Sequence, residues 1–194
     1  MRRLFSWEGG GCVDDITLMH GDCFEQMEKI ADGSVALVLA DPPYNIGVET
    51  ERNGRRKANA WDKIDDYPIF MRRFFKASAR VLKDNGHEAI RCGHEDLRCG
   101  HEDLRPTHIN DAAHCNVWER APIPSQKRFH TCEKPVDILS RIIRVSSRPG
   151  DIVLDPFMGS GSTGIACLQE GRRFIGIEKE QKYFDVAKER IAEM

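Results

Sequence analysis

The sequence predicts an α/β fold in which helices cover both faces of a mostly parallel central sheet. Residues 35–40 and 173–177 are short, almost fully apolar runs, as expected of strands that are buried on both faces. Helical patterns follow these runs, and such alternation of strand and helix is typical of parallel sheets. A chain of 194 residues with 40% hydrophobic residues has enough apolar material for one domain. We expect a lead-in at residues 1–13 and a single domain over residues 14–194.

The first half of this domain begins with a strand at residues 16–19 and a helix at residues 23–30. The buried strand at 35–40 follows. It must end before Pro42-Pro43, because proline has no backbone N–H to continue a sheet ladder. Residues 45–66 are polar and lack an apolar period, which predicts a long loop. We expect residues 50–66 of this loop to lie at the carboxyl end of the strand at 35–40, on the side of the candidate site.

Helical spacing of apolar residues predicts a helix over residues 67–82, which Asp84-Asn85-Gly86 ends, and a strand should follow Gly86. The second half repeats the alternation after a turn at residues 148–151. Its expected elements are a helix at 135–145, a strand at 152–154, a helix at 163–170, a strand at 173–177 and a helix at 181–192.

A seven-residue unit occurs three times in succession between the two halves, at residues 86–92, 93–99 and 100–106. We interpret the second and third copies as an inserted duplication within an irregular segment that extends from 86 to 130. The repeat spaces His87, His94, His101 and His108 evenly, with Cys92 and Cys99 between them, which raises the hypothesis of a metal site. Glycine in each copy argues against the helix that such a site needs, and we expect no metal.

Composition excludes some classes of protein. No apolar run approaches the roughly 18 residues of a membrane span, and no signal-peptide core follows Arg2-Arg3, so we expect a cytoplasmic protein with no membrane partner. Seven cysteines, an odd number, indicate reduced thiols. The net charge of −2 gives no bulk signal for nucleic acid, although basic residues cluster at 52–57, 72–76 and 126–128. Each cluster equally fits a solvated surface.

The stretch from Gly159 to Gly164 has the form G-x-G-x-x-G, directly after a predicted strand and at the start of a helix. Glycines permit a tight turn and the close approach of a ligand to bare backbone, although the turn alone requires glycine too. Glu178 ends the next strand, where a carboxylate can bind the two hydroxyls of a ribose. Together these features indicate a ligand that contains adenosine.

The tetrapeptide Asp41-Pro42-Pro43-Tyr44 ends the buried strand at 35–40. An exocyclic amine of a nucleobase is a poor nucleophile because its lone pair is delocalised into the ring. The Asp41 carboxylate and the Pro42 carbonyl can accept hydrogen bonds from such an amine, and the prolines fix where these acceptors point. Tyr44 offers an aromatic face on which a flipped base can stack. A proline-rich strand end with a half-buried tyrosine is the simpler alternative.

Four segments in this order resemble the amino-methyltransferases of DNA, in the branch whose catalytic motif precedes its cofactor motif: residues 41–44, Lys134-Pro135, residues 155–161 and residues 176–178. The resemblance covers residues 16–91 and 130–194. It implies a Rossmann-like methyltransferase fold and an enzyme that transfers a methyl group from S-adenosylmethionine to a base amine in double-stranded DNA, and it leaves room for a homodimer.

The resemblance also implies roles for single residues. Gly159, Ser160 and Gly161 would pass beneath the methionine part of the cofactor, beside Asp155 and Phe157, and Glu178 would hold its ribose. Residues resembling those that meet the cofactor's adenine are Asp22 and Cys23, and those resembling the contacts of its methionine carboxylate are Thr131, Lys134 and Pro135. Asp41 points to adenine N6, because relatives that methylate cytosine N4 usually carry serine there. Methylation of cytosine C5 is disfavoured, since it needs a cysteine nucleophile.

The chain departs from this family in its middle. Relatives carry a target-recognition region before the segment that resembles Thr131 to Pro135, and here that region is far shorter than the roughly 50 residues of an independent domain. We expect a shortened enzyme of phage or restriction-modification type that methylates adenine. The alternatives are a remnant that binds cofactor or DNA without turnover, a cytosine-N4 methyltransferase, and an amine methyltransferase that acts on RNA or protein.

Overall fold

The computed structural model describes residues 15–43, 49–52, 55–58, 64–90 and 134–194. Its centre is a five-stranded sheet in which every neighbouring pair of strands is parallel. The order across the sheet is β1 (Ile16–His20), β7 (Arg173–Glu178), β6 (Ile152–Asp155), β2 (Val35–Ala40) and β5 (Leu82–Ile90). The predicted α/β fold with a parallel sheet is confirmed.

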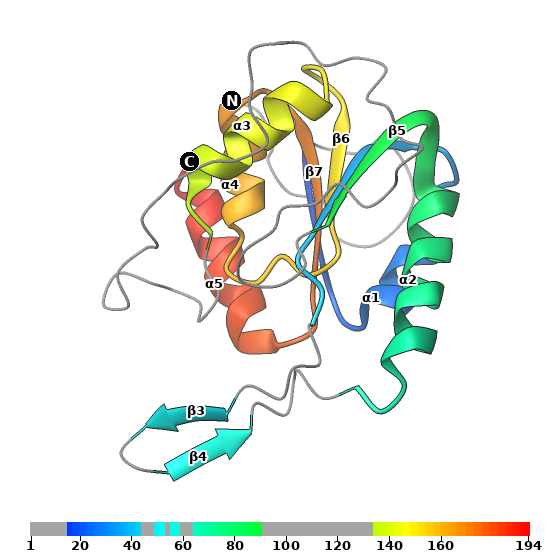
Figure 1. Cartoon of the computed structure of the whole chain (residues 1–194). Helices are drawn as coiled ribbons and strands as arrows, with labels where there is room; N and C mark the ends of the chain where they lie inside the picture. The colour runs from blue at the N-terminus through cyan, green and yellow to red at the C-terminus, as the bar shows by residue number, and fades with distance from the viewer. Residues whose placement is uncertain (1–14, 44–48, 53–54, 59–63, 91–133) are drawn as a thin grey trace.

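Helices cover both faces of this sheet, as Figure 1 shows. The helices are α1 (Cys23–Met27), α2 (Tyr67–Val81), α3 (Val136–Ser146), α4 (Ser162–Gln169) and α5 (Gln181–Ala192). α1 and α2 lie on one face and enclose an apolar cluster with Val38 and Leu154. The other three helices lie on the opposite face, where the cluster includes Leu37 and Val153. Side chains alternate between the faces of a strand, so neighbouring residues of β2 and β6 serve both clusters.

The strand order reverses between β2 and β6. From β2 the chain continues through α2 to β5 on one side, whereas from β6 it continues through α4 to β7 on the other side. The two strands are neighbours, with Leu37 paired to Val153 and Val38 to Leu154. In open parallel sheets, ligands bind outside the carboxyl ends of the strands at such a switch point. The topology therefore places a ligand site where residues follow Ala40 and Asp155.

Strand β5 begins earlier than the sequence predicts. It starts at Leu82, directly after α2, and not after Gly86. Leu82 pairs with Val35, but the next pair along the strands joins His87 to Leu37, so the register shifts between them. The turn residues Asp84-Asn85-Gly86 fall inside this irregularity, which explains why they do not delay the strand. Helix α1 is also shorter than predicted, since it ends at Met27.

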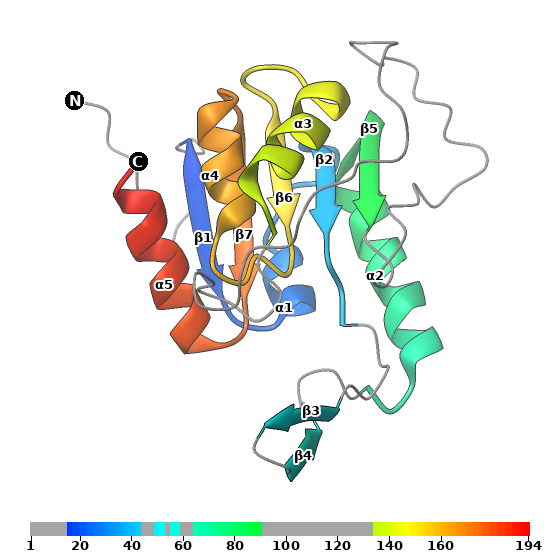
Figure 2. The same cartoon turned by 60° about the vertical axis from the view of Figure 1, so that its left-hand side comes forward.

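A two-stranded antiparallel ribbon replaces part of the loop predicted for residues 45–66. It consists of β3 (Glu49–Arg52) and β4 (Arg55–Ala58), which pair with each other and with no other strand that the structure describes. Figures 1 and 2 both show the ribbon beyond the carboxyl end of β2 and apart from the two helical layers. Because its strands do not join the core, the segment carries no apolar alternation, and the sequence pattern did not predict them.

Several predicted features lie outside the described residues: the lead-in at 1–13, Tyr44, Thr131 and the irregular segment beyond Ile90, with the later repeat copies. Within the described ranges, no group of three His, Cys, Asp or Glu side chains could hold a metal ion. None of the helices described there is long and apolar enough to cross a membrane.

Candidate active site

A glycine bend, defined here as residues 158–161, joins the tip of β6 to the start of α4. Gly159 and Gly161 have backbone φ angles of 54° and 81°, a conformation that favours glycine. At Gly161 there is also no room for a side chain, because an added Cβ would lie 2.9 Å from the Cβ of Ala187. The Met158 N–H donates to the carbonyl of Ile177 over 3.0 Å, which ties the bend to β7.

Glu178 ends β7 and supports the bend. One carboxylate oxygen accepts a hydrogen bond from the Gly159 N–H over 2.9 Å, and the other accepts from the Glu180 N–H over 2.8 Å. Burial raises the pKa of this carboxyl, while these backbone donors oppose the shift. A carboxylate has about four lone-pair positions, so both oxygens keep capacity for a ligand hydroxyl. Glu178 thus has a structural role that the sequence did not predict, in addition to the predicted ribose contact.

Asp155 is the buried residue at the tip of β6. Its carboxylate accepts hydrogen bonds from the Phe157 N–H over 3.0 Å and from the Thr163 hydroxyl over 2.6 Å. Burial raises its pKa to about 6, against the opposing effects of these two donors and of Lys134. Asp155 therefore links both ends of the glycine bend, from the turn after β6 to the first turn of α4.

The Asp41 corner, defined here as residues 41–43, follows the tip of the neighbouring strand, β2. All six residues of β2 are buried. The Lys134 ammonium forms an ion pair with a carboxylate oxygen of Asp41. The two side chains are 19% and 20% exposed. Burial lowers the pKa of Lys134 to about 8, although Asp155 acts in the opposite direction. Lys134 and Pro135 lead into α3, with Pro135 at its N-cap position, so the start of α3 is joined to the switch point.

Asp22 and Cys23 follow β1 at the same edge of the sheet. The Asp22 carboxylate accepts a hydrogen bond from the Phe24 N–H over 3.0 Å and caps α1. The Gly21 N–H donates to the Glu178 carbonyl over 2.9 Å, so this corner adjoins the tip of β7. Burial raises the pKa of the Cys23 thiol to about 12, which makes it a poor nucleophile.

Aromatic side chains pack beneath this edge. Phe157 was predicted as a residue of the cofactor site, whereas Phe70 and Phe74 were predicted only as part of a helix. The Phe157 ring lies 5.6 Å from Phe74 and 6.4 Å from Phe70, measured between ring centroids. Phe70 in turn packs edge-on against Phe24 at 5.3 Å, and the Arg73 guanidinium lies 4.1 Å above the Phe24 ring. Phe157 therefore joins the glycine bend to α2. The spacing of Phe70 and Phe74 indicated a buried helix face, but no local signal linked it to Phe157.

The structure thus brings the predicted residues that it describes to one edge of the sheet, at the carboxyl ends of four strands and at the start of α3. The acceptor carboxylate of Asp41 lies on one side of the switch point, and the glycine bend with Glu178 on the other. Lys134 connects the two sides, since its ammonium pairs with Asp41 and it influences the pKa of Asp155. A nucleoside ligand on the bend and an amine at Asp41 would meet between adjacent strands.

Known proteins that resemble this chain in sequence are DNA methylases. A family model described as DNA methylase matches residues 35–100 and 100–189. The chain is 28% identical to the Type II methyltransferase M.HinfI of Haemophilus influenzae, over 92% of this chain and 68% of that protein. It is also 28% identical to the Type II methyltransferase M2.LlaDCHI of Lactococcus lactis subsp. cremoris, over 92% of this chain and 90% of the relative.

Solved structures share the fold. The M1.HpyAVI–SAM complex superimposes with a TM-score of 0.63 at 22% identity, over 91% of this chain and 98% of the other. The cytosine-N4-specific PvuII DNA methyltransferase gives a TM-score of 0.64 at 16% identity, over 92% and 90% of the two chains. The family match, which extends over most of the chain, shows that this protein belongs to the DNA methylases that use S-adenosylmethionine to methylate adenine N6 or cytosine N4.

Proposed function

We propose that this protein transfers the methyl group of S-adenosylmethionine to adenine N6 in double-stranded DNA, as a modification enzyme of restriction-modification or phage type. The observation that carries the proposal is the position of Asp41: a carboxylate at the tip of β2, beside the switch point and paired with the partly buried Lys134. A negative acceptor at this position suits an amine that must become more nucleophilic.

Asp41 would accept a hydrogen bond from the N6 amine, and the carbonyl of Pro42 would accept the second. Both contacts draw the amine nitrogen toward a tetrahedral geometry, with Pro43 fixing the backbone and Tyr44 stacking on the flipped base. The cofactor supplies an electrophilic methyl group on a sulfonium. When the amine lone pair bonds to the methyl group, the methyl–sulfur bond would break with its electrons staying on sulfur, so the cofactor would leave as S-adenosylhomocysteine. The Asp41 carboxylate would stabilise the positive charge on the nitrogen until the nitrogen releases a proton to solvent.

Residues on the other side of the switch point would hold the cofactor. The proposed contacts are Gly159, Ser160 and Gly161 with the methionine part, Glu178 with the ribose, and Asp22 and Cys23 with the adenine ring. Lys134, which pairs with Asp41, is a donor for the cofactor carboxylate as well, together with Thr131 and Pro135. Asp155 and Phe157 support the bend from below.

Cytosine N4 is the second candidate for the acceptor base, because the fold is shared with a cytosine-N4-specific enzyme. Aspartate at position 41 favours adenine, since cytosine-N4 enzymes usually carry serine in the corresponding position. The remnant hypothesis draws support from the alignment with M.HinfI. It spans 246 positions but takes in only 92% of the 194 residues of this chain, so more than 50 positions of that relative have no counterpart here.

The β3–β4 ribbon supports double-stranded DNA as the partner. Its two strands pair in an antiparallel register and carry four basic residues, Arg52, Arg55, Arg56 and Lys57, against two acidic ones. The major groove of DNA admits a two-stranded ribbon. We propose that this ribbon contacts phosphates of the DNA.

The test is incorporation of labelled methyl groups into unmethylated double-stranded DNA, followed by analysis of the nucleosides. We expect N6-methyladenine from the wild-type protein and a loss of at least about 100-fold in rate for Asp41→Ala, as for other lost transition-state contacts. N4-methylcytosine as the product would replace the adenine assignment. Cofactor binding without incorporation into DNA would support the remnant, and incorporation into RNA or protein instead would identify another acceptor.

A further inference from the structure

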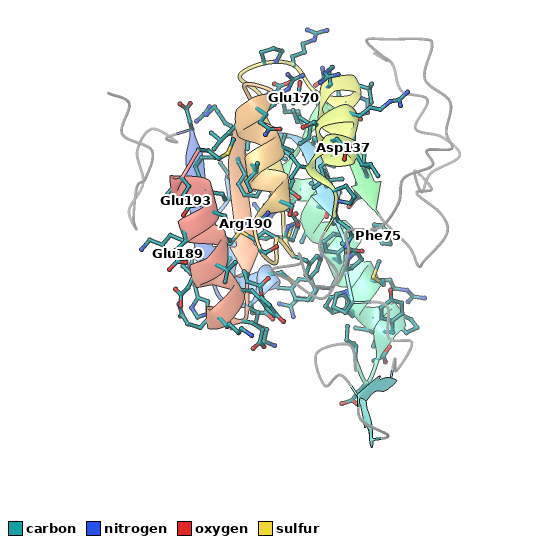
Figure 3. The ribbon with its side chains drawn as sticks, turned by 90° about the vertical axis from the view of Figure 1, so that its left-hand side faces the viewer. Phe75, Asp137, Glu170, Glu189, Arg190 and Glu193 are labelled. Carbon is teal, nitrogen blue, oxygen red and sulfur yellow. The ribbon has the colours of Figure 1, made fainter. Side chains whose placement is uncertain are left out.

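Arg190, on the last turn of α5, reaches the glycine bend. One guanidinium nitrogen, Nη1, donates to the Ser160 carbonyl over 2.7 Å and to the Ser160 hydroxyl over 2.9 Å. The Ser162 hydroxyl lies 3.5 Å from the same nitrogen. Figure 3 shows Arg190 on the side of α5 that faces α4, while Glu189 and Glu193 lie on the outer side. The residue therefore belongs to the interior surface of α5 and not to its charged exterior.

The contact with Arg190 satisfies a buried hydrogen-bond acceptor in the glycine bend. Ser160 lies between Gly159 and Gly161, which both have positive φ angles and which, as glycines, restrict the chain least. Each glycine is held by its own N–H group: Gly159 donates to Glu178, and Gly161 donates to the Met158 carbonyl over 3.0 Å. Ser160 is 3% exposed, so its carbonyl cannot exchange a lost donor for water without cost. Arg190 supplies that donor.

Helix α5 is in turn fixed against the bend. Ala187 is fully buried and leaves no space for a side chain at Gly161, while Ile191 is 1% exposed and lies next to Gly164. Both hydrogen bonds to Ser160 come from the same guanidinium nitrogen, Nη1, which carries two N–H groups, and the planar guanidinium fixes the directions in which they point. The shape of the bend is therefore set by a helix whose sequence follows all the predicted cofactor contacts.

We propose that Arg190 is a positioning residue for the cofactor: through the Ser160 carbonyl and hydroxyl it holds the glycine bend in the conformation that binds S-adenosylmethionine. It does not touch the cofactor in this role. Its effect comes from preorganisation, since a bend that is already ordered loses less conformational freedom when ligand binds. The inference rests on the proposed cofactor role of the bend and is independent of which base is methylated.

The test compares Arg190→Gln, Arg190→Lys and Lys188→Gln in the full chain, with Lys188 as an exposed cation on the same helix. Binding of S-adenosylhomocysteine is measured by titration calorimetry, without DNA. We expect R190Q to bind about 10-fold more weakly, equivalent to about 1.4 kcal/mol. R190K keeps a charged N–H donor but loses the fixed planar geometry of arginine, so it should lose about 3-fold, and K188Q should match the wild type. In turnover, R190Q should raise the KM for cofactor with kcat at saturation within about 2-fold.

A purely structural role would give a different result. It would lower the thermal midpoint of R190Q without changing the Kd for cofactor, and this outcome overturns the inference. If R190Q does not fold, R190K decides, and wild-type affinity in R190K then overturns it. A wild-type chain that binds no cofactor would contradict both the inference and the proposed function, whereas wild-type binding with unaffected variants contradicts the inference alone.

Discussion

The Lys134 ammonium pairs with the Asp41 carboxylate between the start of α3 and the tip of β2, although the two residues are 93 positions apart in the chain. The sequence suggested a cofactor contact for Lys134 and gave no sign of this partner. Both side chains are about one-fifth exposed, so water screens their attraction less than it would at the surface. Lys134 is thus placed to orient the carboxylate on which the proposed chemistry depends.

This pairing predicts a dependence on pH. Because burial lowers the pKa of Lys134 from 10.5 to about 8, the ion pair is intact below pH 8 and is lost as pH rises through that value. We expect methyl transfer to fall above pH 8 as Asp41 loses its orienting partner. The sign for stability is opposite: the folded chain binds fewer protons at this lysine between pH 8 and 10.5, so its contribution to stability rises with pH there. Thermal midpoints across this window therefore separate inactivation from unfolding.

The matched variants are Lys134→Arg and Lys134→Gln. Arginine stays charged throughout, so K134R should abolish the decline near pH 8, and K134Q should have low activity on both sides of it. A decline that persists unchanged in K134R would show that another group titrates.

Glu178→Gln tests the support of the glycine bend. The carboxylate accepts from two backbone N–H groups, those of Gly159 and Glu180, and an amide would direct its own N–H₂ at one of them. We expect unfolding free energy to fall by about 1–3 kcal/mol and cofactor affinity by roughly 10-fold or more. Urea unfolding and calorimetric titration measure the two effects. Glu180→Gln is the control, because that side chain makes no capping hydrogen bond to α5. Equal effects of both variants would contradict the assignment.

Gly161→Ala and Gly171→Ala form a matched pair. Both glycines have positive φ, at 81° and 69°, so alanine adds backbone strain of about 1 kcal/mol in each. Only at Gly161 would the new Cβ meet an obstacle, 2.9 Å from the Cβ of Ala187, whereas at Gly171 nothing lies within 4 Å. G161A should therefore lose a further 1–3 kcal/mol or so from overpacking, measured by urea unfolding, and bind cofactor more weakly. Similar losses of unfolding free energy in the two variants would mean that α5 shifts to accommodate the added methyl group at little cost.

Local patterns predicted most of the regular structure. The buried strand at residues 35–40 and the helix at residues 181–192 were predicted with the observed bounds, because apolar periodicity within a segment reports its burial. The early start of β5 was not predictable in this way, since Leu82 becomes a strand residue only by pairing with Val35 across a register shift. The sequence does contain one local indication of the ribbon. Asn53-Gly54, between its two strands, is a dipeptide typical of two-residue hairpin turns.

The residues of the candidate site also fall into those that local sequence patterns predicted and those that they did not. Asp41, Glu178 and the glycines of the bend were predicted, because strand ends and glycine spacing are visible along the chain. The partners of these residues were not. Arg190 lies 30 positions from Ser160, and its spacing in α5 is that of an ordinary charged residue. Contacts between distant side chains depend on how helices pack on the sheet, which no single segment specifies.

The ribbon gives a direct test of DNA contact, because its two short strands carry four basic residues, Arg52, Arg55, Arg56 and Lys57. If the ribbon contacts phosphates, Arg55→Gln should reduce the slope of log Kd against log salt by roughly 0.9, the value for one phosphate contact on duplex DNA. Lys188→Gln removes the same charge from an exposed position of α5 and should leave the slope nearly unchanged. Fluorescence anisotropy with one duplex at several salt concentrations measures both. Equal changes would indicate that the net charge of the protein matters and the position of the ribbon does not, which would remove the argument for a DNA contact at the ribbon.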